Sequence, residues 1–146
     1  MKRLTLAVVA LAFTLVSFAK VPSTVNEKVL TAFSSTFKNA TEVSWHEYTD
    51  YYEVRFIQAS IDTRVKYDTE GNVLQSMRYY SEEALPLLIK AKLRNKFADK
   101  KVFGVTEIAQ DNQVDYYITL EDSKNWTKVK SDYFGNMTVE KKYKKA

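Results

Sequence analysis

The side chains that most often carry out catalysis are scarce in this sequence. Cysteine is absent, and the single histidine is His46, beside Glu47 in a segment whose apolar residues alternate as in a β-strand. A hydroxyl or thiol nucleophile needs a base placed beside it. Because His46 alternates with the large apolar Trp45, we expect it to point away from the core as an ordinary strand residue. The sequence therefore predicts no catalytic residue, and the protein is predicted not to be an enzyme.

Metals and cofactors also lack a recognisable binding motif. A zinc site needs three or four nitrogen, sulfur or carboxylate ligands at close spacing, and the sequence contains no such cluster. The three glycines, Gly71, Gly104 and Gly135, are too far apart to form a loop that cradles a phosphate. The adjacent carboxylates Glu82-Glu83 and Glu121-Asp122 fit a helix start and a strand end, where they complement a helix dipole or a turn. We therefore predict neither a cofactor nor a metal.

Binding is the chemistry that the residues do favour. The strand that contains Tyr52, Val54 and Phe56 alternates apolar and polar side chains, so its other residues should lie on the outward face of a sheet. Tyr, Trp and Arg are frequent anchors of protein interfaces, because they bury a large area at small entropic cost. The candidate binding face predicted from this alternation in both halves of the chain consists of Tyr51, Glu53, Arg55, Arg64, Lys66, Tyr117, Trp126 and Lys128.

Two other interpretations of this face remain open. Its aromatic and charged residues could be cross-strand pairs that merely complete a solvated sheet. The outward rings of Tyr51, Tyr117 and Trp126 could also stack on sugar rings, which would make the face a glycan-binding surface.

A helix is predicted at the start of each half of the chain. Thr24, with Glu27 three residues later, fits a capping box, and the apolar residues between Val25 and Phe37 follow helical spacing. In the second half, Ser81–Glu83 fits a short capped turn before a helix that begins near Pro86, a residue favoured at the first helical position.

After each helix the apolar period changes from nearly four residues to two, which indicates antiparallel strands. The expected strands are 43–45, 50–56, 61–67 and 73–79 in the first half and 102–108, 114–120, 126–131 and 137–141 in the second.

The two halves share a sequence repeat. The segment 63–72 returns as 127–136, with Thr, Val, Lys, Asp, Gly and Asn in register. Both copies contain Asp-x-x-Gly-Asn, which is typical of a hairpin turn in which glycine adopts a positive φ. The repeat predicts an α+β fold of two tandem units, each a helix packed on an antiparallel sheet of about four strands. We expect the first unit at residues 20–80 and the second at 81–146.

Residues 1–19 have the features of a secretory signal peptide. Lys2 and Arg3 precede the apolar run Leu4–Phe18, and Ser17-Phe18-Ala19 supplies the small residues of a cleavage site. The run is shorter than the roughly 20 residues that a membrane-spanning helix needs, which disfavours a retained anchor. We predict cleavage after Ala19, no stable membrane insertion afterwards, and export to the periplasm or the cell exterior.

The charge balance gives little support to a polyanionic partner. Without the two basic residues of the leader, 20 of the 22 basic residues remain against 18 acidic ones. A nucleic-acid-binding domain normally carries a basic stripe on one face. Here the charges are mixed along the chain except in Lys141–Lys145, which we interpret as a solvated strand end, with an anion site as the alternative. No nucleic-acid partner is predicted.

Several motifs together resemble one known family. They are Ala32-Phe33, Phe37–Ala40, Val43–Glu47, Tyr52–Phe56, the two Asp-x-x-Gly-Asn turns and Leu85-Pro86. In combination they resemble the PepSY-like, β-lactamase-inhibitor-like family of exported proteins of Gram-negative bacteria, over nearly the whole chain after residue 19. The resemblance implies tandem helix-on-sheet units and a periplasmic or extracellular setting, and little about activity.

The sequence departs from the family pattern in the second half, at residues 100–105 and at Ser131, which stands where the first half has Tyr67. No inhibitory loop can be carried over residue by residue, so β-lactamase inhibition is not predicted.

Two functions from different classes follow from these observations. The first is an exported, non-enzymatic module that binds an unidentified protein partner, with a secreted or periplasmic hydrolase as one candidate. The alternative is a glycan-binding envelope protein that uses outward Trp and Tyr side chains.

Overall fold

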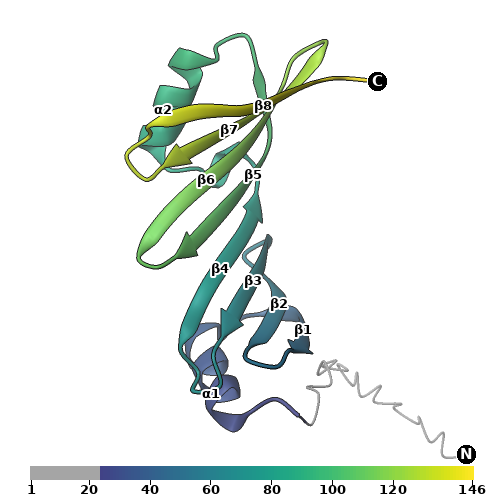
Figure 1. Cartoon of the computed structure of the whole chain (residues 1–146), viewed down its shortest axis with the longest axis vertical. Helices are drawn as coiled ribbons and strands as arrows, with labels where there is room; N and C mark the ends of the chain where they lie inside the picture. Colours follow the sequence, from purple (N-terminus) through teal and green to yellow (C-terminus); the bar gives the residue numbers. More distant parts are fainter. Residues whose placement is uncertain (1–23) are drawn as a thin grey trace, which may run out of the picture.

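The computed structural model describes residues 24–146, so the predicted leader lies outside the described residues. A helix precedes four strands, and a second helix precedes four more (Figure 1). The first part consists of α1 (Glu27–Thr36), β1 (Thr41–Glu47), β2 (Tyr52–Gln58), β3 (Ile61–Tyr67) and β4 (Val73–Tyr80). After the short 3₁₀ helix η1 (Glu82–Ala84) come α2 (Leu87–Lys96), β5 (Lys101–Gln110), β6 (Gln113–Glu121), β7 (Asn125–Asp132) and β8 (Met137–Lys144). Within residues 24–146, neither helix is long and apolar enough to cross a membrane.

α1 begins two residues later than the sequence prediction. The N-cap residue is Asn26, whose side-chain oxygen accepts a hydrogen bond from the backbone N–H of Lys28 at 2.8 Å. The expected capping box of Thr24 and Glu27 is therefore wrong, because a closer polar side chain satisfies the free N–H groups of the first turn. Val29 and Phe33 are buried on one side of α1, as the helical spacing of the apolar residues predicts.

The eight strands form one antiparallel sheet in the order of the chain, from β1 to β8. β4 and β5 pair from Gln75 opposite Gln110 to Tyr80 opposite Val105. The predicted fold of two tandem units, each with its own sheet of about four strands, is therefore wrong. Joining β4 to β5 gives partners to backbone N–H and C=O groups that two separate sheets would leave exposed at their edges.

Both helices cover the same face of the sheet. Residues opposite each other in an antiparallel pair point to one face. Val65, beneath α1, lies opposite Ser76, and Tyr80 lies opposite Val105, beneath α2. Because Ser76 and Tyr80 are an even number of residues apart in β4, Val65 and Val105 share a face. We call it the helix face and the other the open face; Figure 1 shows α1 and α2 near opposite ends of the elongated sheet.

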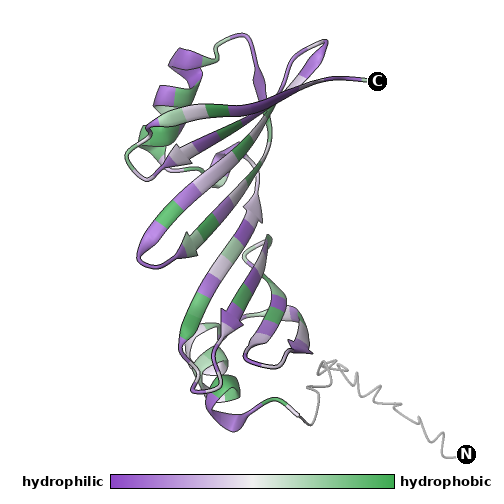
Figure 2. Cartoon of the chain, viewed as in Figure 1, coloured by the Kyte–Doolittle hydropathy of each residue, from purple (hydrophilic) through white to green (hydrophobic). Residues whose placement is uncertain are grey.

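Each helix packs into its own buried cluster on the helix face. Beneath α1 the cluster is aromatic: the ring centroid of Phe33 lies 5.3 Å from that of Trp45 and 5.2 Å from that of Phe56, both edge to face. Beneath α2 it is mainly aliphatic, with Ile89 and Leu93 against β5, β6 and β7. Figure 2 shows the resulting alternation of hydrophobic and hydrophilic residues along the strands. This alternation is the reason the strands could be located from the sequence.

Candidate binding face

The open face carries all eight residues of the predicted binding face. At one end of the sheet, Glu53 lies opposite Lys66 and Arg55 opposite Arg64. Tyr51 directly precedes β2, and the Lys66 Nζ atom lies 5.3 Å from the centroid of its ring.

The second group lies on β6 and β7, at the other end of the same face. Tyr117 is opposite Lys130, Lys128 is opposite Thr119, and Trp126 is opposite Glu121. The two groups are thus parts of one surface, separated by β4 and β5.

The centre of the open face comes from β4 and β5 and was missed in the sequence analysis. Met77 lies opposite Ile108, and Tyr79 lies opposite Thr106. Tyr79 is 58% exposed, whereas Met77 and Ile108 are half-buried. The alternation within 73–79 places Met77 and Tyr79 on one side of their strand, but only the pairing of β4 with β5 makes that side the middle of a larger surface.

An aromatic cluster lies at the β5 and β7 part of the open face. Phe103 is 66% exposed, and its ring meets the ring of Trp126 edge to face with 4.8 Å between centroids. The Lys145 Nζ atom lies 4.5 Å from the centroid of Trp126 and 2.8 Å from a carboxylate oxygen of Glu121. Trp126 is therefore half-buried by its neighbours and not fully outward. Phe103 was also missed, because it stands at a bulge between Val102 and Gly104 where simple alternation fails.

Several charges of the open face are paired within the face itself. Arg55 donates two hydrogen bonds to Asp62, at 3.1 and 2.6 Å, and this contact holds the pKa of the Asp62 carboxyl below its usual range. The Lys130 Nζ atom lies 2.9 Å from Asp115, whose hydrogen bond raises the pKa of Lys130. Such half-exposed pairs contribute little to stability, so they mainly set which charges remain free.

A hollow of about 480 Å³ opens beside the β2–β3 hairpin, lined mostly by residues of the open face. Tyr79 and Phe103 line it together with the hydroxyl-bearing Thr106 and Thr119. A Cβ atom at Gly104, also in the lining, would meet no atom within 4 Å. Packing therefore does not require glycine at this strand position, and the backbone there stays open to an incoming group.

The least exposed carboxylates bind other side chains of the protein. On the helix face, one oxygen of Glu107 is 3.1 Å from Arg78 and the other accepts a hydrogen bond from the Tyr80 hydroxyl at 2.6 Å. Burial, and secondarily Glu107, raises the pKa of Tyr80. With both oxygens occupied, Glu107 joins β4 to β5 and is poorly placed to act as a base.

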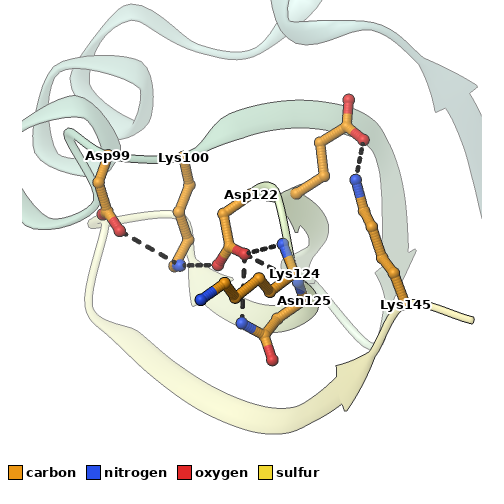
Figure 3. A network of polar contacts seen from close by, with 7 residues as sticks. Asp99, Lys100, Asp122, Lys124, Asn125 and Lys145 are labelled. Atoms are coloured by element: carbon orange, nitrogen blue, oxygen red, sulfur yellow. Dashed lines mark hydrogen bonds and ion pairs between the residues drawn. The ribbon is translucent and has the colours of Figure 1, made fainter.

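A second polar network holds the β6–β7 loop to the start of β5 (Figure 3). The Lys100 Nζ atom lies 2.5 Å from Asp122 and 3.4 Å from Asp99. The other oxygen of Asp122 accepts backbone hydrogen bonds from Lys124 and Asn125, both at 2.8 Å. The hydrogen bond from Lys100, with these backbone contacts, holds the pKa of Asp122 well below its usual range. This arrangement stabilises a loop.

His46 is exposed on the open face, opposite Glu53 in β2. In the described part of the chain, no three His, Asp or Glu side chains lie together as metal ligands. What the open face offers is aromatic, apolar and cationic contact area.

Comparisons with solved structures relate the fold to proteins of Bacteroides species. A BLIP-like protein from Bacteroides fragilis has 18% sequence identity and a TM-score of 0.64, over 83% of this chain and 88% of that one. A DUF2874 family protein from Bacteroides ovatus has 16% identity and a TM-score of 0.62, over 86% and 89% of the two chains. A candidate periplasmic protein from Bacteroides eggerthii has 17% identity and a TM-score of 0.60, over 81% and 87%.

At these identities the likeness concerns the fold alone, and at that level the resemblance to the β-lactamase-inhibitor-like family is confirmed. No protein-family model matches the sequence, and no curated protein matches it.

Proposed function

We propose that this protein is an exported, non-enzymatic module that binds a protein partner through the open face of its sheet. One observation carries the proposal. Eight paired strands form a continuous face to which neither α1 nor α2 contributes cover, and exposed aromatic and cationic side chains gather on it.

The layout of the open face resembles that of protein interfaces. Met77, Ile108 and the ring of Tyr79 form an apolar centre, and charged residues lie towards both ends. Protein interfaces commonly have an apolar core with a polar rim, and a few aromatic or Arg anchors supply most of the binding energy. Tyr79 and Phe103 are 58% and 66% exposed, so both rings are accessible as anchors for a partner.

The proposal includes the export of the protein from the cytoplasm. Export is supported by the signal-peptide features of residues 1–19 and by the similarity of fold to a candidate periplasmic protein. N-terminal sequencing of the protein recovered from its native host should find Lys20 as the first residue.

A secreted or periplasmic hydrolase is one candidate partner, in view of the BLIP-like neighbour. Inhibition of a β-lactamase is not proposed, since fold similarity alone does not transfer activity.

The proposal is tested by removing exposed side chains from each face in turn. An open-face triple variant carries Arg64→Ala, Tyr79→Ala and Phe103→Ala. A matched helix-side variant carries Arg94→Ala, Leu87→Ala and Phe134→Ala, all of them exposed as well. Proteins retained by each immobilised variant from the native envelope and medium are identified, and each candidate is then purified and titrated by calorimetry.

We expect at least one purified partner to bind the wild type and the helix-side variant alike, and to bind the open-face variant at least tenfold more weakly. Circular dichroism of the three proteins controls for folding. If every purified candidate binds the two variants equally, the open face is only a solvated sheet and the proposal fails.

Glycan binding is the second candidate function, and the hollow beside the β2–β3 hairpin favours it. Aromatic rings stack on sugars and hydroxyl groups hydrogen-bond to them, and Tyr79, Phe103, Thr106 and Thr119 bring both to one place. Polysaccharide binding by the purified protein without any protein partner, lost in a Tyr79→Ala, Phe103→Ala variant, would establish this function in place of the first.

A further inference from the structure

Two lysines of the open face lie directly opposite each other. Lys128 in β7 and Lys141 in β8 are cross-strand partners in the antiparallel pair. Both point away from the helix face, because Lys128 alternates with the buried Thr127 and Val129. Like charges directly opposite in a sheet are destabilising. The register therefore sets two like charges opposite each other in the free protein.

The two facing lysines differ from the other lysines of this part of the open face. The other two lysines of the same part of the face have partners: Lys130 binds Asp115 at 2.9 Å, and Lys145 binds Glu121 at 2.8 Å. Among residues 24–146, neither Lys128 nor Lys141 lies within ion-pair distance of a carboxylate. The two lysines thus form an uncompensated cationic pair.

Aromatic side chains flank the cationic pair. On the same face, the neighbouring cross-strand pair of β7 and β8 is Trp126 opposite Tyr143. The Lys141 Nζ atom lies 5.0 Å from the centroid of the Tyr143 ring. When a partner covers these rings and excludes water, an ion pair beside them strengthens, because the local dielectric constant falls. An incoming anion would also remove the repulsion between the two ammonium groups without breaking any internal ion pair.

We propose that Lys128 and Lys141 together bind a carboxylate of an acidic segment, rich in Asp or Glu, of the protein that docks on the open face. The inference rests on the proposed function and specifies the chemistry of the partner. We commit to a protein partner because the lysine pair shares the open face with the apolar centre on β4 and β5, from which β6 separates it. The hollow suited to a sugar is lined by neither lysine, although Lys128 lies opposite its lining residue Thr119.

The repulsion is tested in the free protein. Lys141→Gln should raise the thermal midpoint by about 1 to 4 °C at low ionic strength, because the pair loses one of two opposed charges. The rise should shrink in 0.5 M salt, where exposed charges are screened. Lys142→Gln is the matched control: it removes the same charge from the neighbouring residue, which lies opposite Thr127 on the other face. A midpoint that rises equally in both variants, or in neither, overturns the inference.

Binding is tested with two defined probes, an octaglutamate peptide and an oligogalacturonate with eight carboxylates. Titration is followed by tryptophan fluorescence. Trp126 lies two residues from Lys128 on the same face and should respond to binding, whereas Trp45 is buried beneath α1. We expect the peptide to bind the wild type, and a Lys128→Gln, Lys141→Gln variant to bind it at least tenfold more weakly. A Lys142→Gln, Lys144→Gln variant, with the same net charge, should bind within about twofold of the wild type. Equal weakening in both variants, no peptide binding, or tighter binding of the oligogalacturonate overturns the proposal.

The inference and the proposed function can fail separately. A purified partner that binds the wild type and the Lys128→Gln, Lys141→Gln variant equally, yet loses affinity for the open-face triple variant, refutes the inference and leaves the proposed function standing. If the affinity of every purified partner falls equally in the open-face and helix-side triple variants, the proposed function is refuted. This holds whether or not the octaglutamate peptide binds.

Discussion

Lys100 and Asp122 show how a single pair of residues controls a loop of this fold. Their side chains are only 12% and 17% exposed, the least of any ion pair in residues 24–146. Asp122 also caps the β6–β7 loop through backbone hydrogen bonds from Lys124 and Asn125. A carboxylate that accepts several hydrogen bonds in its charged form has a lowered pKa in the folded state. Loss of the charge should therefore weaken the fold.

This gives a pH-dependent prediction for Asp122→Asn. A group whose pKa is lower when folded contributes its stability above the unfolded pKa, near 4, and loses it as the pH falls through the folded value. We expect Asp122→Asn to have a lower free energy of unfolding than the wild type at pH 7, and the difference to shrink below about pH 4. Urea unfolding at a series of pH values measures this difference.

Asp111→Asn provides the control, because Asp111 is an exposed turn residue whose side chain contacts Gln110 and no lysine. It makes the same chemical change at a place outside the Lys100–Asp122 network. A difference for Asp122→Asn that stays constant from pH 7 to pH 2 would show that the charge of Asp122 does not matter.

At the scale of elements, the β2–β3 hairpin is built from unusual residues. Ala59 and Ser60 adopt φ values of 49° and 64°. Two successive left-handed residues are typical of a two-residue hairpin turn, where Asn-Gly is strongly preferred. Ala and Ser both carry a Cβ that disfavours this region. The hairpin therefore stores backbone strain beside the hollow of the open face.

Relieving that strain should stabilise the protein. Replacing Ala59→Asn and Ser60→Gly together should raise the free energy of unfolding by about 1 kcal/mol. The β5–β6 hairpin offers the comparison: Asp111 and Asn112 have φ values of 51° and 61°, and their short polar side chains already tolerate them. Asp111→Asn with Asn112→Gly should gain less. Chemical denaturation compares the two; an equal gain would mean that the residues at 59 and 60 are not strained.

The two Asp-x-x-Gly-Asn turns differ in how much space surrounds their glycines. Gly71 and Gly135 have φ values of 88° and 76°. A Cβ at Gly71 would lie 3.0 Å from the backbone oxygen of Lys28 in α1, whereas a Cβ at Gly135 would meet only the flexible side chain of Lys92. A helix backbone cannot move aside as a lysine side chain can.

We therefore expect Gly71→Ala to be more destabilising than Gly135→Ala, with each costing about 1 to 3 kcal/mol because of the positive φ. Gly104→Ala serves as control: its Cβ would meet nothing, and its cost should lie within about 0.5 kcal/mol. Thermal unfolding gives the order, and Gly135→Ala as the least stable of the three would contradict it.

At the scale of the whole molecule, the two buried clusters are joined through one sheet. Tyr80, at the end of β4, belongs to the cluster beneath α2, and Ile61 of β3 packs against it. The ladder between β4 and β5 and the contact of Arg78 with Glu107 cross the same junction. Unfolding the α1 part would remove residues from the α2 core, so the two parts should unfold together.

Val54→Ala is expected to test this coupling. Val54 is fully buried beneath α1, and its truncation should cost about 2 to 4 kcal/mol through the cavity that it leaves. Differential scanning calorimetry should show one transition in the wild type and in the variant, shifted to lower temperature as a whole. Two separate transitions, with only the first one shifted, would show that the α1 and α2 parts unfold independently.

The alternation of apolar and polar residues along the sequence was enough to locate the strands of this protein. The predicted strands overlap the observed ones, and 61–67 matches β3 residue for residue, because burial of one side of a strand imposes alternation that is visible along the chain. The same alternation placed Arg55, Arg64 and Lys128 on the side away from the core. The sequence repeat, the unit boundary at residue 80 and the binding role of these side chains stay predictions.

Only the tertiary structure decided which surfaces are continuous. Alternation records the side on which a residue lies, but it carries no information about which strands pair across an intervening helix. The pairing of β4 with β5 depends on backbone hydrogen bonds between segments separated by η1 and α2. That pairing placed Met77 beside Ile108 at the centre of the open face, and the register of β7 against β8 set Lys128 opposite Lys141.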